Sequence, residues 1–273
     1  MNSISEKLEL LGKGLYANIP DVLTLKSIPT SSELEYVGSE DFDKVMLESI
    51  LPQAIEEKIN FYDLFEIDYQ YVCRCLRILN YGPYFDVNTI FCPDCEAVSK
   101  GEYQVNLNTI ECIPLPKEFK NEIIIKRDEF MDYQGDVVFS LPTIRTMLSA
   151  YEDKMFKHDD GHVNREMARL CYTIKSLGTK QNCTPVDVLT AIKHDFSPAD
   201  YIILKNTARQ MSDYGLRAGG TTQCPACRSM NAKFIALADD RFFRPSMGNL
   251  KQWKLDKSKR RDEDAAGNKT AAV

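Results

Sequence analysis

Apolar and polar residues alternate in many short stretches of the first 141 positions, and this pattern predicts β-strands. The alternation covers residues 21–27 and 33–37, and Ile28-Pro29-Thr30-Ser31-Ser32 between them predicts a turn that joins two strands. Further strands are expected where the alternation returns, at residues 87–91, 102–107, 109–114, 122–126, 137–141 and 232–237.

Two stretches of this first part have a helical spacing of apolar residues instead. Ser39-Glu40-Asp41 supplies a cap and acidic first-turn residues for a helix that Pro52 ends or bends. A second helix is expected to have Asp68 as its cap and Gly82 as its stop.

At residue 143 the period changes to helical, and four helices are expected before the second cysteine motif. Two of them cover residues 143–156 and 164–177. The other two begin at Thr184-Pro185 and Ser197-Pro198, where a hydroxyl cap precedes a proline and an acidic residue follows at the third helical position. This combination is strong local evidence for a helix start.

Two Cys-Pro-x-Cys motifs are the candidate chemistry of the chain, at Cys92 and Cys95 and again at Cys224 and Cys227. A gap of two residues lets both sulfurs of a motif turn toward one point, and four thiolates form a closed tetrahedral shell for Zn²⁺. Such a site has no open position, so its expected role is structural. The alternative, in which each motif pairs with Cys112 or with another chain, stays open.

Other interpretations of the cysteines and histidines are weaker. A thioredoxin-like pair would open a helix, whereas a strand-like run follows each motif. Cys73 and Cys75 lie two apart on the second helix, do not share a face, and are expected to be core thiols. His158 and His162 flank Asp159-Asp160-Gly161, which predicts an exposed loop rather than a metal site.

The pattern as a whole predicts an α+β fold with a small β core, a zinc-ribbon-like Cys₄ site and a long helical insertion between its two halves. The expected parts are an α+β domain (1–141), a helical insertion (142–215), the second cysteine motif with a closing strand (216–250), and a charged tail (251–273). The tail has too few apolar residues to fold by itself, although Trp253 could anchor its start on a surface.

Composition narrows the classes of function. Of 273 residues, 44% are hydrophobic and 27% are charged, which is typical of a soluble globular protein. No apolar run approaches the roughly 20 residues of a membrane helix, and no secretion signal is visible, so nine cysteines favour reduced thiols and metal binding over disulfides. A net charge of −6 disfavours nucleic-acid binding by the whole chain.

No catalytic motif is found, and we expect a protein that is not an enzyme.

A series of short motifs also resembles a known family. Their order is Asp63-Leu64, Asp68, Leu76-Arg77-Ile78, Tyr81-Gly82, Cys92-Pro93-Asp94-Cys95, a β stretch, a helical insertion, Cys224-Pro225-Ala226-Cys227 and Phe242-Phe243-Arg244-Pro245. With Ile28-Pro29-Thr30-Ser31 near the start, this order resembles the T4-type bacteriophage baseplate hub and hub-assembly proteins over residues 20–245.

The resemblance implies a non-enzymatic virion or tail-assembly component that binds other baseplate hub, tail tube or tape-measure proteins. It implies a place in the host cytoplasm during assembly and in the tail baseplate if the protein is retained. Cys92, Cys95, Cys224 and Cys227 are the residues that transfer as zinc ligands. The alternative is a zinc-ribbon nucleic-acid-binding regulator that uses the basic run Lys257-Ser258-Lys259-Arg260-Arg261 in the tail.

Overall fold

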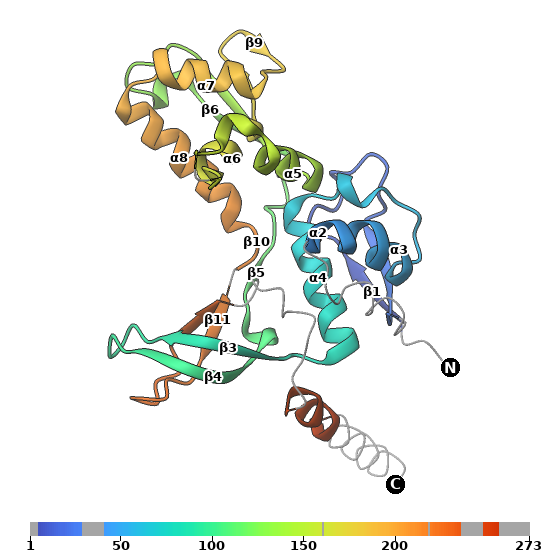
Figure 1. Cartoon of the computed structure of the whole chain (residues 1–273). Helices are drawn as coiled ribbons and strands as arrows, with labels where there is room; N and C mark the ends of the chain where they lie inside the picture. The colour runs from blue at the N-terminus through green and yellow to red at the C-terminus, as the bar shows by residue number, and fades with distance from the viewer. Residues whose placement is uncertain (1–4, 29–40, 160, 218, 236–247, 257–273) are drawn as a thin grey trace.

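The computed structural model describes residues 5–28, 41–159, 161–217, 219–235 and 248–256 (Figure 1). Its helices and small sheets confirm the α+β class. Two clusters of buried apolar side chains form two cores, one built mainly from the chain on both sides of the insertion and one built mainly from the insertion, to which Phe65 and Ile67 also contribute.

The first core begins with a two-stranded sheet in which β1 (Ser5–Glu9) pairs antiparallel with β2 (Val22–Lys26). β2 is the predicted strand at residues 21–27, but its partner precedes it in the chain, and the strand expected at residues 33–37 lies outside the described residues. Leu23 and Leu25 of β2 are fully buried, because alternate side chains of this strand face the core.

A short helical run follows, made of α2 (Phe42–Val45), a π-helical turn (Met46–Ile50) and α3 (Leu51–Ala54). The Asp41 side chain accepts a hydrogen bond from the Lys44 N–H at 3.1 Å, so Asp41 is itself the cap of α2 and not the first-turn residue that the sequence predicted. Pro52 lies in the first turn of α3, and the run ends two residues after it. Ser39 and Glu40 lie outside the described residues.

The predicted start of the next helix is wrong. The helix α4 (Glu66–Tyr81) begins two residues before Asp68, and Phe65 is its cap residue. Asp68 is fully buried and accepts hydrogen bonds from the N–H groups of Leu11 (2.6 Å) and Gly12 (3.0 Å) and from the hydroxyl of Tyr16 (2.6 Å). Its carboxylate thus satisfies backbone donors of a distant loop instead of those of its own helix.

Gly82 ends α4 as predicted, with φ at 79°. A side chain there would also collide with Trp253, whose ring lies 2.4 Å from the position of a Cβ atom. Trp253 belongs to a helix at residues 248–256, in which Asn249 contacts Asp86 (3.0 Å) and Gln104 (2.6 Å). The tail is therefore helical and docked as far as residue 256, and the rest of it lies outside the described residues.

The inserted unit has its own four-stranded sheet, in the order β6 (Glu122–Ile125), β7 (Val137–Ser140), β8 (Ile174–Leu177) and β9 (Lys180–Gln181). Four helices accompany these strands in the upper part of Figure 1: α5 (Ile144–Glu152), α6 (Arg165–Thr173), α7 (Pro185–His194) and α8 (Pro198–Asp213). None of the helices in the described parts of the chain is long and apolar enough to cross a membrane.

Two predictions about this unit need correction. The helix expected over residues 164–177 ends at Thr173, and residues 174–177 form β8, which pairs with β7. The boundary placed after residue 141 therefore falls between two strands of one sheet, and the insertion is mixed α and β rather than helical. Local periodicity pointed to a helix, because Ile174 and Leu177 are buried three positions apart, a spacing that places two residues on one face of a helix but on opposite faces of a strand.

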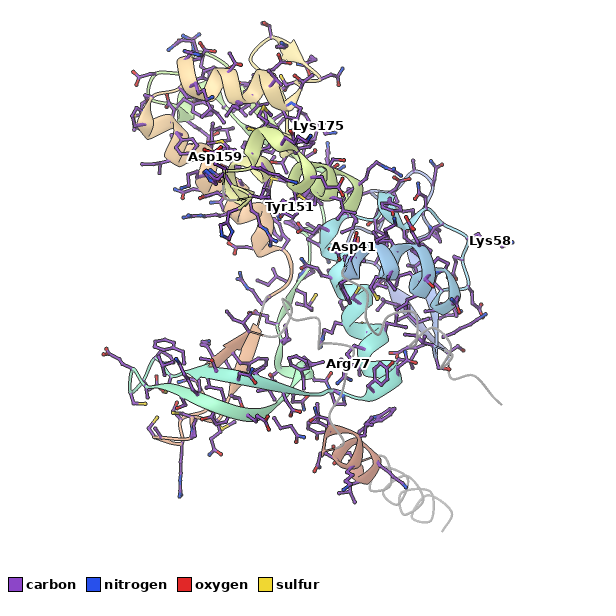
Figure 2. The ribbon with its side chains drawn as sticks, viewed as in Figure 1. Asp41, Lys58, Arg77, Tyr151, Asp159 and Lys175 are labelled. Atoms are coloured by element: carbon purple, nitrogen blue, oxygen red, sulfur yellow. The ribbon has the colours of Figure 1, made fainter. Side chains whose placement is uncertain are left out.

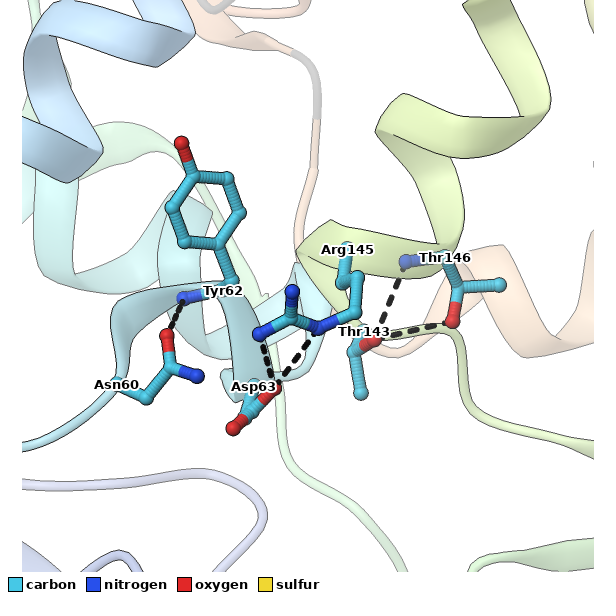
Figure 3. A network of polar contacts seen from close by, with 6 residues as sticks. All are labelled: Asn60, Tyr62, Asp63, Thr143, Arg145 and Thr146. Carbon is cyan, nitrogen blue, oxygen red and sulfur yellow. Dashed lines mark hydrogen bonds and ion pairs between the residues drawn. The ribbon is translucent and has the colours of Figure 1, made fainter. Parts of the chain in front are cut away.

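The inserted unit leaves and rejoins the rest of the chain through adjacent strands. β5 (Cys112–Ile113), the shortened form of the strand expected at 109–114, pairs antiparallel with β10 (Gly215–Leu216). A second contact joins the residues before α4 to the start of α5: Arg145 binds Asp63 at 3.0 Å and lies over the Tyr62 ring at 5.4 Å (Figure 3). Both ends of the insertion are thereby fixed to the first core.

One carboxylate organises the N-terminal end of α8. Asp200 is fully buried and accepts hydrogen bonds from the N–H groups of Met131 (2.6 Å), Asp132 (3.1 Å) and Tyr133 (3.0 Å). Burial alone would raise its pKa, but these hydrogen bonds and one with Ser197 outweigh burial and lower the pKa of Asp200 below its ordinary value.

We therefore expect Asp200 to make the inserted unit sensitive to acid. Because its pKa is lower in the folded than in the unfolded protein, its stabilising contribution is present above about pH 4, the unfolded pKa, and is lost as the pH falls through the folded pKa. Asp200→Asn should lower the urea midpoint at pH 7 and flatten its decline with acid. An Asp200→Asn protein whose midpoint declines as steeply as wild type would contradict this assignment.

Candidate metal centre

The four cysteines of the two motifs lie on two β-hairpins of the same design. β3 (Tyr84–Phe91) and β4 (Val98–Asn106) flank the first motif, and β11 (Gly219–Thr222) and β12 (Ala232–Ile235) flank the second. They form one sheet in the order β11-β12-β3-β4, in which Lys233 of β12 pairs with Phe91 of β3. This pairing places the two cysteine turns side by side.

The two turns share their backbone conformation. The N–H of Cys92 donates to the carbonyl of Ala97 at 2.9 Å, and the N–H of Cys224 donates to that of Ser229 at 2.7 Å. The residue after the second cysteine has positive φ in both turns, 58° at Glu96 and 64° at Arg228. Because such values are rare for residues other than glycine, their recurrence indicates that the turn itself requires this conformation.

The sulfur atoms converge. Cys92 Sγ lies 3.6 Å from Cys227 Sγ, Cys95 Sγ lies 3.8 Å from Cys224 Sγ, and all four sulfurs lie within 4.8 Å of one another. Cys92 and Cys224 are buried, whereas Cys95 and Cys227 are exposed. Four cysteines in this arrangement could hold a metal ion, and both motifs contribute to the same site.

Backbone donors favour a thiolate at Cys224 of the second motif, whereas at Cys227 the Ser229 N–H lowers the pKa but the neighbouring sulfurs and burial outweigh it and raise the pKa to about 12. The N–H groups of Cys227 and Ala226 point at the Cys224 sulfur and lower its pKa to about 7. Four sulfurs this close cannot all ionise unless a cation lies between them, because neighbouring negative charges repel. The arrangement therefore suits a cation better than it suits four free thiols.

A carboxylate joins the two turns beside the cysteines. Asp94, the variable residue of the first motif, accepts hydrogen bonds from the Ser229 hydroxyl and from the Asn231 side chain, the latter at 3.0 Å. These bonds lower the pKa of Asp94 below its usual range. The sequence did not single out Asp94, because its partners lie more than 130 residues away and no motif connects them.

We expect Asp94→Ala to weaken metal binding roughly tenfold, as loss of a residue that orients metal ligands does elsewhere. The contact holds the two turns together, so its removal should leave four cysteines that converge less well. Metal affinity measured by competition with a chelator would show the change. Asp94→Asn keeps an acceptor oxygen and should bind metal more tightly than Asp94→Ala; equal affinities in all three proteins would contradict the role.

The remaining cysteines and histidines lie elsewhere. Cys112 belongs to β5 and is not part of the metal-site cluster, which among the described residues consists of the four motif cysteines. Cys73 is buried as expected, and Cys75 is half-buried in the same core, where burial raises its pKa to about 11. The N–H of His158 donates to the carbonyl of His162 at 2.8 Å in a loop before α6, as predicted for a connection.

Comparison of the chain with models of known protein families, with characterised proteins and with solved structures found no significant match.

Proposed function

We propose that this chain is a structural or assembly component of the baseplate hub of a contractile phage tail, with a fold held together by structural zinc. The observation that carries the proposal is the convergence of four cysteines from two hairpins on either side of a large inserted unit. A donor set made only of thiolates has no open position for a substrate, so a metal ion bound there has a structural and not a catalytic role.

The spacing of the sulfurs supports zinc as the ion. Thiolates bound tetrahedrally at about 2.3 Å from zinc lie about 3.8 Å from each other, and in this chain the sulfur pairs Cys92–Cys227 and Cys95–Cys224 lie at 3.6 and 3.8 Å. Iron also accepts four thiolates, so the metal must be measured. Zinc in the purified protein supports the proposal; iron in its place would refute the choice of metal and keep the structural role.

The sheet β11-β12-β3-β4, which we call the ribbon sheet, offers a surface for another tail protein. Phe91 and Val98 are register partners on β3 and β4, with 45% and 58% of their side-chain surface exposed, and Ile235 on β12 is 70% exposed. Met230, in the second cysteine turn, is 65% exposed. Exposed apolar side chains that gather on one small sheet are typical of protein contact sites. This surface and the order of motifs shared with hub proteins support partners among the hub, tail tube or tape-measure proteins.

The test of the tail role is genetic and structural. In a phage that carries the gene, its deletion should stop assembly of baseplates while heads still accumulate, and electron microscopy of the lysate would show this. A plasmid copy should restore tails, and a copy with Cys92→Ser and Cys224→Ser should fail to do so. Normal tails in the deletion strain would refute the proposal.

A nucleic-acid-binding role predicts a different result. Binding to phosphates weakens steeply as salt rises, whereas an apolar protein contact does not. A salt-sensitive mobility shift with DNA or RNA, combined with normal tails in the deletion strain, would favour the regulator instead.

A further inference from the structure

The inserted unit carries a basic groove that the proposed metal site and tail role do not use. It lies between α6 and α8, with Tyr151 of α5 at one side (Figure 2). Its charged residues are Arg165, Glu166, Arg169, Lys205 and Arg209, and its remaining lining residues are the buried Leu170 and the half-buried Ala208. We define these eight residues as the α6–α8 groove.

The cations form two pairs, one on each helix. Arg165 and Arg169 lie four positions apart on α6, and Lys205 and Arg209 lie four positions apart on α8. Because residues at this spacing share a helix face, each helix presents two positive side chains to the groove. A chain with a net charge of −6 has thus gathered four cations around one hollow.

Carboxylates of the protein neutralise only part of this charge. Glu166 contacts Lys205 at 3.0 Å and Arg209 at 3.3 Å, and Glu66 contacts Arg169 at 2.7 Å. Arg165 stacks over the ring of Tyr151 at 5.1 Å, and no carboxylate among the described residues lies within ion-pair distance of it. The groove therefore keeps an excess of positive charge, with two cations sharing Glu166.

The position of Arg165 does not help its own helix. It is the first residue of α6, where the helix dipole favours negative charge and a cation is locally unfavourable. The guanidinium, although exposed, lies over the Tyr151 ring at the groove. A residue that costs its helix some stability and yet faces a groove is consistent with selection for binding.

We propose that the α6–α8 groove binds an acidic segment of a partner protein, with Asp or Glu side chains on the cations of the two helices and an apolar side chain against the half-buried Tyr151 and Ala208. Glu166 already shows that a carboxylate fits between Lys205 and Arg209. Glu166 in the groove, Glu66 paired with Arg169 beside it, and the overall negative charge oppose a long polyphosphate, which needs an extended basic surface. The groove shares no residue with the metal centre. The peptide-binding proposal can therefore be refuted while the proposed metal site stands.

The test uses the full-length, metal-bound protein and a short fluorescein-labelled peptide of repeated Glu-Glu-Phe triplets. The peptide should bind saturably by fluorescence anisotropy, more weakly at higher salt, while the matching Gln-Gln-Phe peptide should not bind. The double variant Arg165→Glu, Arg209→Glu should weaken binding by at least about tenfold, the effect of losing one well-placed charge contact or more.

A matched variant controls for charge. Lys100→Glu with Lys233→Glu makes the same change in net charge on exposed positions of the ribbon sheet and should bind the peptide like wild type. Circular dichroism and metal content would show that each variant is folded. If the two Arg→Glu substitutions disturb folding, the double variant Arg165→Gln, Arg209→Gln takes their place in the binding experiment. Absence of saturable binding, equal loss in the control pair, or tighter binding to oligodeoxythymidylate than to the acidic peptide would each overturn the proposal.

Discussion

Replacing Cys92 or Cys224 with serine is expected to remove the metal ion completely and to unfold the ribbon sheet. Each substitution takes one thiolate from the four-sulfur cluster, and three thiolates from two hairpins no longer enclose an ion. We expect about one metal ion per chain in the wild type, none in either variant, and a fall in melting temperature of more than about 10 °C. Elemental analysis of protein purified in reducing buffer, with a thermal melt, measures both.

Cys112→Ser is the matched control for this experiment. Cys112 is a half-buried cysteine on β5, outside the cluster, and its substitution should leave the metal content unchanged. Loss of metal in Cys112→Ser, or in only one of Cys92→Ser and Cys224→Ser, would show that the two motifs do not share one ion.

Phe139→Ala is expected to destabilise the inserted unit by about 3–5 kcal/mol, the usual cost of removing a large side chain from a core. Phe139 is fully buried in the second core, on the strand β7 that pairs with both β6 and β8. Because the metal centre belongs to the other core, the variant should keep its metal ion. Hydrogen exchange should therefore rise in residues 122–213 and stay low in the ribbon sheet.

The neighbouring strand supplies a control for Phe139. Ile124 on β6 has 45% of its surface exposed, and Ile124→Ala should change the free energy of unfolding by no more than about 0.5 kcal/mol. If Phe139→Ala released the metal ion and opened both cores together, the inserted unit would not be an independent folding unit.

Local sequence signals predicted the elements that local chemistry determines. Thr184 caps α7 by a reciprocal capping box with Asp187, and Ser197 accepts a hydrogen bond from Asp200 at the start of α8. Gly82 adopts the positive φ of a helix stop. In each case the side chain and the backbone group that it satisfies lie within a few residues of each other, so the pattern is visible in one window of sequence.

Predictions failed where distant partners compete with local preference. Asp68 is placed like a helix cap but serves the N–H groups of Leu11 and Gly12, more than 50 residues earlier. Ile174 continues a helical period but pairs with Phe139 as a strand. Trp253 docks against Gly82, in line with the expectation that it anchors the start of the tail, but the helix at residues 248–256 that carries it could not be inferred from local composition.

The sequence by itself determined the α+β class, the four cysteines of the candidate metal centre and the starts of the capped helices. Metal ligation by paired cysteines leaves its mark in spacing alone, since two residues between thiols are enough to turn both to one point. The tertiary structure decided that both motifs meet in one cluster, that Asp94 joins them, and that the insertion has a sheet and core of its own. It also brought the four cations of the α6–α8 groove together from helices about 40 residues apart, because packing of α6 on α8 depends on burial across the whole unit and on no local pattern.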